Sequence, residues 1–204
     1  LVNLLMEHPE ILAEPDALSG ITITAYQPAY GIIGDPAKRD PHTRQSADHS
    51  MVYIVSTKLR KAYELAAAKG SGAIAEGNDN WWTTLMLAPI DYGREAIVHP
   101  ETRRLMDCIE FEHGGPEYDD RYPDGIPTSL RIELEDGRVL DSGFVMYPSG
   151  HARNTTCDLE HILDHKAGLL GALVMDDASS LIDTCNSIGG LDAAGIHSLF
   201  DCTI

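Results

Sequence analysis

The residue types best suited to chemistry are concentrated in one string, from Asp40 to Tyr53, which reads Asp-Pro-His-Thr-Arg-Gln-Ser-Ala-Asp-His-Ser-Met-Val-Tyr. This string joins a polar loop to a long apolar-periodic helix, expected from about Ala47 to Lys69. His49 and Tyr53 are four residues apart, so the helix would place both side chains on one face. The spacing therefore predicts an imidazole and a phenol that act at one site.

Anion binding is a second chemistry that this string could perform. Ser46 or Asp48 would cap the long helix, and the free N–H groups of its first turn would favour a bound anion. Arg44 would add a cation, so we predict it as a substrate-binding residue. A solvated helix start, with Asp48 as an ordinary cap and basic residues on a loop, uses the same residue types and is the alternative.

A second polar string, Tyr147-Pro-Ser-Gly-His-Ala-Arg-Asn, follows the last expected strand. His151 and Arg153 could bind a carboxylate there, and Gly150 would let the backbone approach a ligand closely. We predict both side chains as substrate-binding groups. A polar hinge held by ordinary hydrogen bonds is the alternative.

The charge of the chain restricts its partners. The 204 residues carry a formal net charge of −17, and this field repels nucleic acid and anionic membrane surfaces. A small anion can still bind, because basic residues cluster locally. The hydrophobic content of 43% is typical of a globular chain with a core. No signal peptide or transmembrane run is visible, and we expect a cytoplasmic location.

Metal chemistry is not indicated by the sequence. The four cysteines include no Cys-x-x-Cys pair, which makes reduced thiols the simplest interpretation. His161 and His165 have the spacing of metal ligands on a helix, but the string lacks the His-Glu-x-x-His arrangement and a third ligand. We therefore predict no metal site.

Hydrophobic patterning predicts an α+β fold with a small antiparallel sheet for residues 1–152. Residues 1–12 should form a helix that is interrupted by Pro9, and residues 21–27 alternate as a strand. Residues 28–45 are expected to form a long loop, a length that favours a functional role. Residues 128–147 should form a hairpin around Asp136-Gly137.

Two registers are possible for this hairpin. A two-residue turn would place Leu130 and Ile132 opposite Gly143 and Asp141. A three-residue loop with Gly137 in the left-handed region would set the same face opposite Leu140, Ser142 and Phe144. The second register buries more apolar surface, so we predict it. Residues 153–204 are expected to be all-helical, so that the sequence predicts two domains, 1–152 and 153–204.

The two polar strings together resemble the 2-methylcitrate dehydratase (MmgE/PrpD) family. In that family, a string of the type Arg-x-x-Ala-Asp-His-Ser-x-x-Tyr opens a helix of the smaller domain. A Gly-His-x-Arg string marks the return to the helical domain. The corresponding strings here run from Arg44 to Tyr53 and from Gly150 to Arg153. The resemblance covers essentially the whole chain, as the C-terminal half of such an enzyme.

The resemblance implies a cofactor-independent hydro-lyase of propionate catabolism, a cytoplasmic homodimer that removes water from a tricarboxylate such as 2-methylcitrate. Elimination needs a base, an acid and cations for the carboxylates. His49 and Tyr53 are predicted as the catalytic groups. Tyr53 is the position that the resemblance carries over most directly, as a residue lining the pocket, whereas Arg44, His151 and Arg153 are chosen for their chemistry.

The resemblance also implies a partner for this chain, an N-terminal helical domain that carries the main base. Residues 1–152 would be the lid of that enzyme, and residues 153–204 would complete the helical domain. Decarboxylation of cis-aconitate and epimerisation of an imino-dicarboxylate are alternative reactions within the family. A different alternative is a non-catalytic folded fragment that self-associates through residues 158–200.

Overall fold

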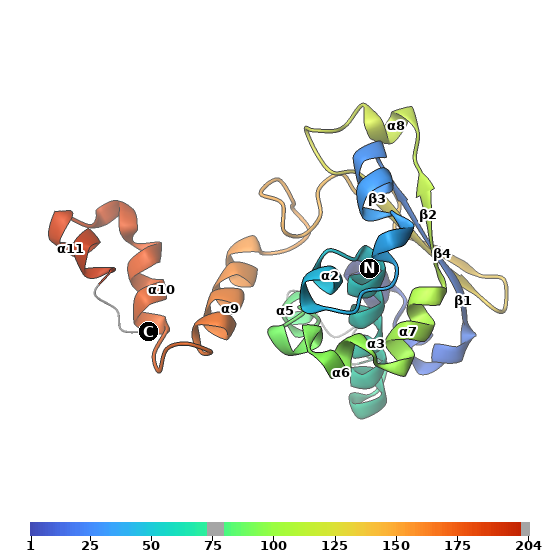
Figure 1. The fold of residues 1–204 in the computed structure, drawn as a ribbon, viewed down its shortest axis with the longest axis horizontal. Helices are drawn as coiled ribbons and strands as arrows, with labels where there is room; N and C mark the ends of the chain where they lie inside the picture. Colours follow the sequence, from blue (N-terminus) through green and yellow to red (C-terminus); the bar gives the residue numbers. More distant parts are fainter. Residues whose placement is uncertain (73–79, 201–204) are drawn as a thin grey trace. The chain divides into compact units, whose positions relative to one another are not determined.

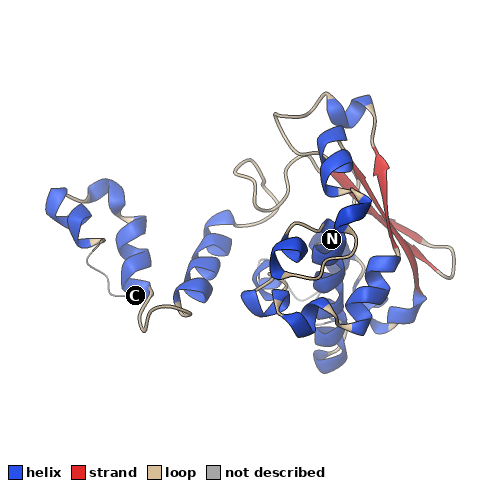
Figure 2. Cartoon of the chain, viewed as in Figure 1, coloured by secondary structure: helices blue, strands red, loops and turns tan. Residues whose placement is uncertain are grey.

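The computed structural model describes residues 1–72 and 80–200 of the chain (Figure 1). The chain divides into two compact units, residues 1–157 and 158–204. The predicted α+β class is confirmed, with one sheet and several helices in the first unit and helices in the second (Figure 2). The role of residues 153–204 in completing a helical domain stays a prediction. Cys202 lies outside the described residues.

The sheet has four strands in the order β2-β1-β3-β4. Their bounds are Leu18–Ala25 for β1, Ile109–His113 for β2, Thr128–Leu134 for β3 and Val139–Asp141 for β4. Strand β1 is central, and its alternating Ile21, Ile23 and Ala25 are buried, as the period-two pattern predicts. Strands β1/β3 and β3/β4 are antiparallel. Strand β2 instead runs parallel to β1, which the sequence did not predict.

The β3–β4 hairpin has the predicted three-residue loop. Ile132 lies opposite Leu140, and Gly137 has a φ of +85°, a conformation that glycine adopts at low cost. The amide of Ser142 donates to the carbonyl of Leu130 at 2.9 Å, which places Ser142 in the predicted register. Beyond it, Thr128 pairs with Val145 through an isolated bridge, so regular strand pairing ends earlier than expected.

The hydrophobic core of the first unit also contains helices, which come from the N-terminal segment and from the connection between β1 and β2. The long helix α3, Met51–Lys69, contacts α7, Pro100–Asp107, and the 3-10 helix η1, Pro9–Ala13 (Figure 1). One apolar cluster joins Leu59 and Leu105 of these helices to Ile21 of the sheet. The other elements of this unit are α1 (Val2–Glu7), η2 (Pro15–Ala17), η3 (Ala29–Ile33), η4 (Pro36–Lys38), α2 (Arg44–Asp48), α5 (Asn80–Thr84), η5 (Pro89–Tyr92), α6 (Arg94–Ile97) and α8 (Pro116–Asp119).

The second unit consists of α9 (Leu159–Gly171), α10 (Ser179–Asn186), η6 (Ile188–Gly190) and α11 (Ala193–Ser198). Helices α9 and α10 contact each other. Within residues 158–200 that the structure describes, no helix of this unit contains a buried residue. Large apolar side chains are exposed instead, including Leu163, Leu173 and Phe200. These helices therefore form local structure without a dry core of their own.

Candidate functional site

The junction between α2 and α3 organises the first polar string. Thr43 caps α2 in a reciprocal capping box, in which the Ser46 amide donates to Thr43 Oγ1 at 3.1 Å and the Thr43 amide donates to Ser46 Oγ at 3.0 Å. Helix α2 ends at Asp48 with His49 as its C-cap, and Ser50 then caps α3 through a hydrogen bond from the Tyr53 amide. Ser50 Oγ also donates to the Lys38 carbonyl at 2.7 Å, which ties the junction to the preceding loop.

This break corrects the prediction of one continuous helix. Neither Ser46 nor Asp48 caps the long helix, because Ser50 performs that role. His49 lies outside α3 and its side chain is 67% exposed, whereas Tyr53 is completely buried. The two side chains therefore do not share one exposed helix face. Sequence spacing alone could not locate the break, since neither proline nor glycine marks it.

The ring of His49 is held by groups from α2. Its Nδ1 lies 2.9 Å from the Gln45 carbonyl oxygen and 2.5 Å from Asp48 Oδ1. A carbonyl oxygen only accepts hydrogen bonds, so Nδ1 carries the hydrogen. The Gln45 carbonyl and then Asp48 raise the pKa of His49 above its ordinary value, while the nearby Lys38 ammonium opposes this rise. The protonated ring is thus more favourable than in an ordinary histidine, and the ring orientation is defined.

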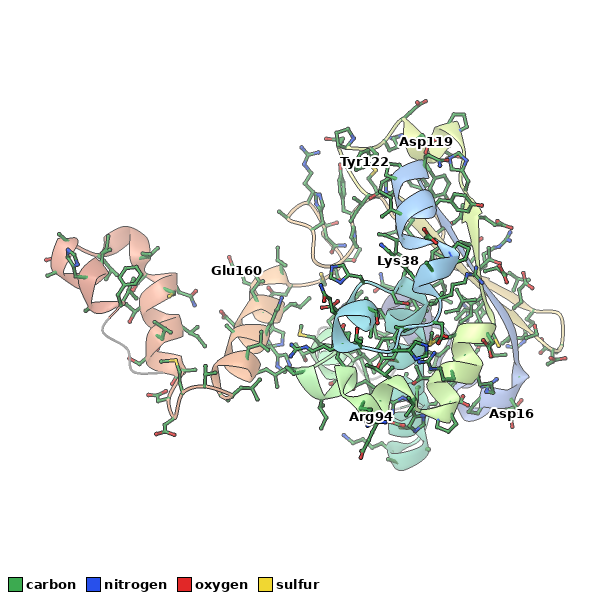
Figure 3. All side chains as sticks on the ribbon, viewed as in Figure 1. Asp16, Lys38, Arg94, Asp119, Tyr122 and Glu160 are labelled. Carbon is green, nitrogen blue, oxygen red and sulfur yellow. The ribbon has the colours of Figure 1, made fainter. Side chains whose placement is uncertain are left out.

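A shallow hollow of about 360 Å³ lies beside this ring. Its lining offers a cation, hydroxyl groups and an imidazole, from Lys38, Thr43, Gln45, Ser46 and His49. Lys38 ends η4 and lies near α2 (Figure 3). In the described part of the chain, its ammonium has no ion-pair partner, so it is available to an anion from solvent. This set can bind a carboxylate and exchange a proton with it.

Tyr53 lies behind this surface and contributes to the core. Its hydroxyl donates a hydrogen bond to the Asp91 carbonyl oxygen, and burial raises the pKa of this phenol. The carboxylate of Asp91 is itself buried, where it accepts from Lys61 Nζ at 2.7 Å and from the Ala88 amide at 2.8 Å. Tyr53 therefore anchors the η5 turn to α3. Its side chain is not part of the hollow's lining.

Tyr92 joins the neighbourhood of the site although sequence reasoning did not select it. Its ring centroid is 6.0 Å from that of Tyr53. Burial raises the pKa of Tyr92, the Asp48 carboxylate adds to the rise, and Arg44 opposes it. Arg44 and Asp48 therefore lie close enough to act on this phenol. No sequence signal links position 92 to position 48, because only the packing of η5 against α2 brings them together.

Arg103 fixes the loop that leads into the site. It donates to the Ile97 carbonyl at 2.8 Å, to the Pro41 carbonyl at 2.6 Å and to Asp40 Oδ1 at 2.5 Å. This last bond holds the pKa of Asp40 below its ordinary value. Sequence reasoning did not select Arg103 as a site residue. Arg103 can hold the loop in place because α7 lies close to it, and the sequence does not show this proximity.

The second predicted group, His151 and Arg153, is engaged with protein partners. Arg153 Nη1 lies 2.5 Å from Asp124 Oδ1 and 3.3 Å from the Tyr147 hydroxyl. The guanidinium holds the pKa of Asp124 below its ordinary value. The His151 ring packs against the Tyr147 ring at a centroid distance of 4.8 Å, and its Nδ1 accepts from the Arg153 amide. This geometry fits the hinge alternative.

The five predicted site residues thus fall into separate groups. His49 lines the hollow, Arg44 lies close enough to Tyr92 to act on its phenol, and Tyr53 supports the η5 turn. His151 and Arg153 belong to the Asp124–Tyr147 cluster. Across the described residues, no recorded hydrogen bond, ion pair or ring contact joins the two clusters. The structure therefore gives one hollow with available charge and one internally neutralised cluster.

In residues 1–72 and 80–200, no group of three or more His, Cys, Asp or Glu side chains is arranged to hold a metal ion. None of the helices formed by these residues combines the length and the apolar character needed to cross a bilayer.

Comparison with known proteins gives one partial relative. A stretch of 68 residues is 43% identical to a protein named "Probable 2-methylcitrate dehydratase" from Saccharomyces cerevisiae. This stretch covers 32% of the present chain and 13% of that protein. No family model matches the chain. Part of the chain is therefore similar to a dehydratase, while most of its length has no counterpart in this match.

Proposed function

We propose that this chain forms part of a cofactor-independent carbon–oxygen lyase that removes water from a tricarboxylate such as 2-methylcitrate. The observation that supports this proposal most is the hollow beside α2, where the Lys38 ammonium and the oriented imidazole of His49 line one space. The partial similarity to a protein named as a dehydratase supports the same reaction class. A cation and a proton-transfer group are the components that such an elimination requires.

The proposal gives each group a role. Lys38 and Arg44 attract the carboxylates of the substrate, and His49 exchanges a proton with it. Tyr53 can act as the predicted catalytic group only when its hydroxyl leaves the Asp91 carbonyl oxygen, so its direct effect in this structure is to hold the η5 turn. An N-terminal helical domain, which the resemblance implies, would add the main base, and the active form would be a cytoplasmic homodimer.

Turnover of 2-methylcitrate tests this function. We expect the chain, mixed with the helical domain of a 2-methylcitrate dehydratase, to produce the unsaturated acid, with its absorbance as the readout. His49→Ala should abolish most of this activity, and His151→Ala serves as the matched control. Turnover that is insensitive to His49→Ala would contradict the assignment. Release of CO₂ from cis-aconitate, or inversion of an imino-dicarboxylate without loss of water, would identify the family's other reactions.

A second candidate function is self-association through the second unit. Large apolar side chains are exposed on α9 and just after its C-terminal end, and they favour self-association. A helix without a buried face gains stability when it packs against a second copy of the chain. We expect Leu163→Lys with Leu170→Lys to convert a dimer to a monomer in analytical ultracentrifugation, while Lys166→Ala on the same helix leaves the dimer intact. A monomeric wild-type chain would contradict this candidate.

A further inference from the structure

The two ring nitrogens of His49 have unequal surroundings. Nδ1 faces both the Gln45 carbonyl oxygen and Asp48 Oδ1. For Nε2, no protein partner is recorded in the part of the chain that the structure describes. The ring also lines the hollow. Nε2 is consequently the nitrogen that remains for a ligand.

The hydrogen on Nδ1 decides what Nε2 can do. In a neutral imidazole, one nitrogen donates and the other accepts, and the partner of the first fixes the identity of both. Because Nδ1 donates toward α2, Nε2 holds a lone pair in the neutral ring. When Nε2 accepts a proton, the ring becomes a cation, and the adjacent carboxylate of Asp48 stabilises that charge.

We propose that Asp48 is a positioning residue, which acts with the Gln45 carbonyl to orient His49 so that Nε2 exchanges a proton with the anionic ligand in the hollow. This inference rests on the proposed function for the identity of the ligand. In this step, the protonated Nε2 gives its proton to the departing hydroxyl group of the ligand, while the carbon–oxygen bond breaks and its electron pair leaves with the water. The main base takes a proton from carbon, and the electron pair left behind forms the new double bond. The Nε2 lone pair then takes a proton from solvent, which restores the imidazolium.

The charged groups around the Asp48–His49 pair come from each neighbouring element. Asp48 itself and the Gln45 carbonyl belong to α2, and the Lys38 ammonium approaches from η4. The phenol of Tyr92, on η5, lies close enough to Asp48 and to Arg44 for both charges to act on it. Loss of the Asp48 charge would leave His49 facing Lys38 without compensation. The protonated ring would then become less favourable, although the Gln45 carbonyl would still orient Nδ1–H.

The protonation state of His49 can be read directly by NMR. In the uniformly ¹⁵N-labelled full chain, long-range ¹H–¹⁵N spectra recorded against pH report the tautomer and the pKa of each histidine. We expect the Nδ1–H tautomer for neutral His49. Asp48→Asn should keep this tautomer, because the amide oxygen still accepts, but lower the pKa of His49. The control Glu117→Gln removes one exposed carboxylate with the same change in charge and should leave His49 unchanged.

Activity supplies the second readout of the positioning role. With the helical domain present, Asp48→Asn should lower kcat roughly tenfold to a hundredfold with little change in KM, and shift the pH profile in the direction of the altered His49 pKa. A neutral His49 in the Nε2–H tautomer, or a His49 pKa that Asp48→Asn does not change, would overturn the proposal. If the NMR result is as expected but no tricarboxylate is turned over, the orientation of His49 is supported and the proposed function fails.

Discussion

The two polar clusters of the first unit contain the same residue types but differ in what they leave available. In the Asp124–Tyr147 cluster, Arg153 is paired with a carboxylate and His151 packs on an aromatic ring. At the α2–α3 junction, the cation of Lys38 is unpaired among the described residues and His49 lines a hollow. The comparison shows that a basic side chain indicates an anion-binding site only when no neighbouring carboxylate already pairs with it.

The largest expected difference between the clusters is in catalysis. His49→Ala should lower 2-methylcitrate turnover by about 10²-fold or more, the range found for the loss of a proton-transfer group. His151→Ala should change turnover by less than about threefold, because His151 packs within its own cluster. Steady-state kinetics in the presence of the helical domain measures both. Equal losses for the two variants would remove the distinction.

The next largest difference between the two clusters should be in their contribution to the free energy of unfolding. Arg103→Ala leaves two backbone carbonyls without their donor, so we expect the free energy of unfolding to fall by about 1–3 kcal/mol. Arg153→Ala removes an exposed pair and should have a smaller effect. Urea denaturation followed by circular dichroism provides the comparison. A larger loss for Arg153→Ala would show that the second cluster, not the junction, stabilises the first unit.

The two clusters should also differ in their contribution to anion affinity, which a matched pair of charge deletions can measure. Lys38→Ala and Arg153→Ala each remove one positive charge from the same acidic chain. We expect Lys38→Ala to weaken the binding of 2-methylcitrate about tenfold, equivalent to about 1.4 kcal/mol, while Arg153→Ala changes it little. Isothermal titration calorimetry at low salt measures both affinities. If the order is reversed, the substrate carboxylates bind at the second cluster.

The smallest expected effect is a dependence of binding on pH. The pKa of His49 is raised in the folded chain, so the protonated ring persists to a higher pH than in an ordinary histidine. Affinity for the anion should therefore be highest below this pKa and decline by a few-fold as the pH rises through it. By the same linkage, the stability contributed by His49 is present below the pKa of the unfolded chain and is lost as the pH rises through the folded value.

A matched variant tests this pH effect. His49→Gln removes the titrating group but keeps a polar side chain, so its affinity should vary less with pH over the same interval. Asp48→Asn should move the decline to lower pH. Calorimetric titrations at several pH values provide the data. An unchanged pH dependence in His49→Gln would assign the effect to another group.

Local chemistry made much of the fold predictable. The period-two pattern located β1, and Gly137 with the alternating apolar residues specified the register of the hairpin. The parallel pairing of β2 was missed, because a strand's partner across an 83-residue connection, residues 26–108, is determined by packing. The break before α3 was missed for another reason, since Ser46, Asp48 and Ser50 are all competent caps and sequence does not rank them.

The candidate site was predictable only in part. The string around His49 was found because its residue types and helix-start chemistry are local. The burial of Tyr53, the approach of Tyr92 and the clamp by Arg103 depend on η5 and α7, which contact the junction from distant positions in the chain. The neutralisation of Arg153 by Asp124 likewise joins residues from separate loops. A pattern of side-chain types does not contain these contacts.

The most direct test is a titration of the ¹⁵N-labelled chain with 2-methylcitrate, followed in ¹H–¹⁵N spectra. We predict that the amide and imidazole signals of residues 43–50 shift together and saturate, with His49 Nε2 among the most affected nuclei. Lys38→Ala should weaken this response. Shifts that saturate at residues 147–154, or an absence of saturable shifts at the α2–α3 junction, would contradict the claim that this hollow is the ligand site.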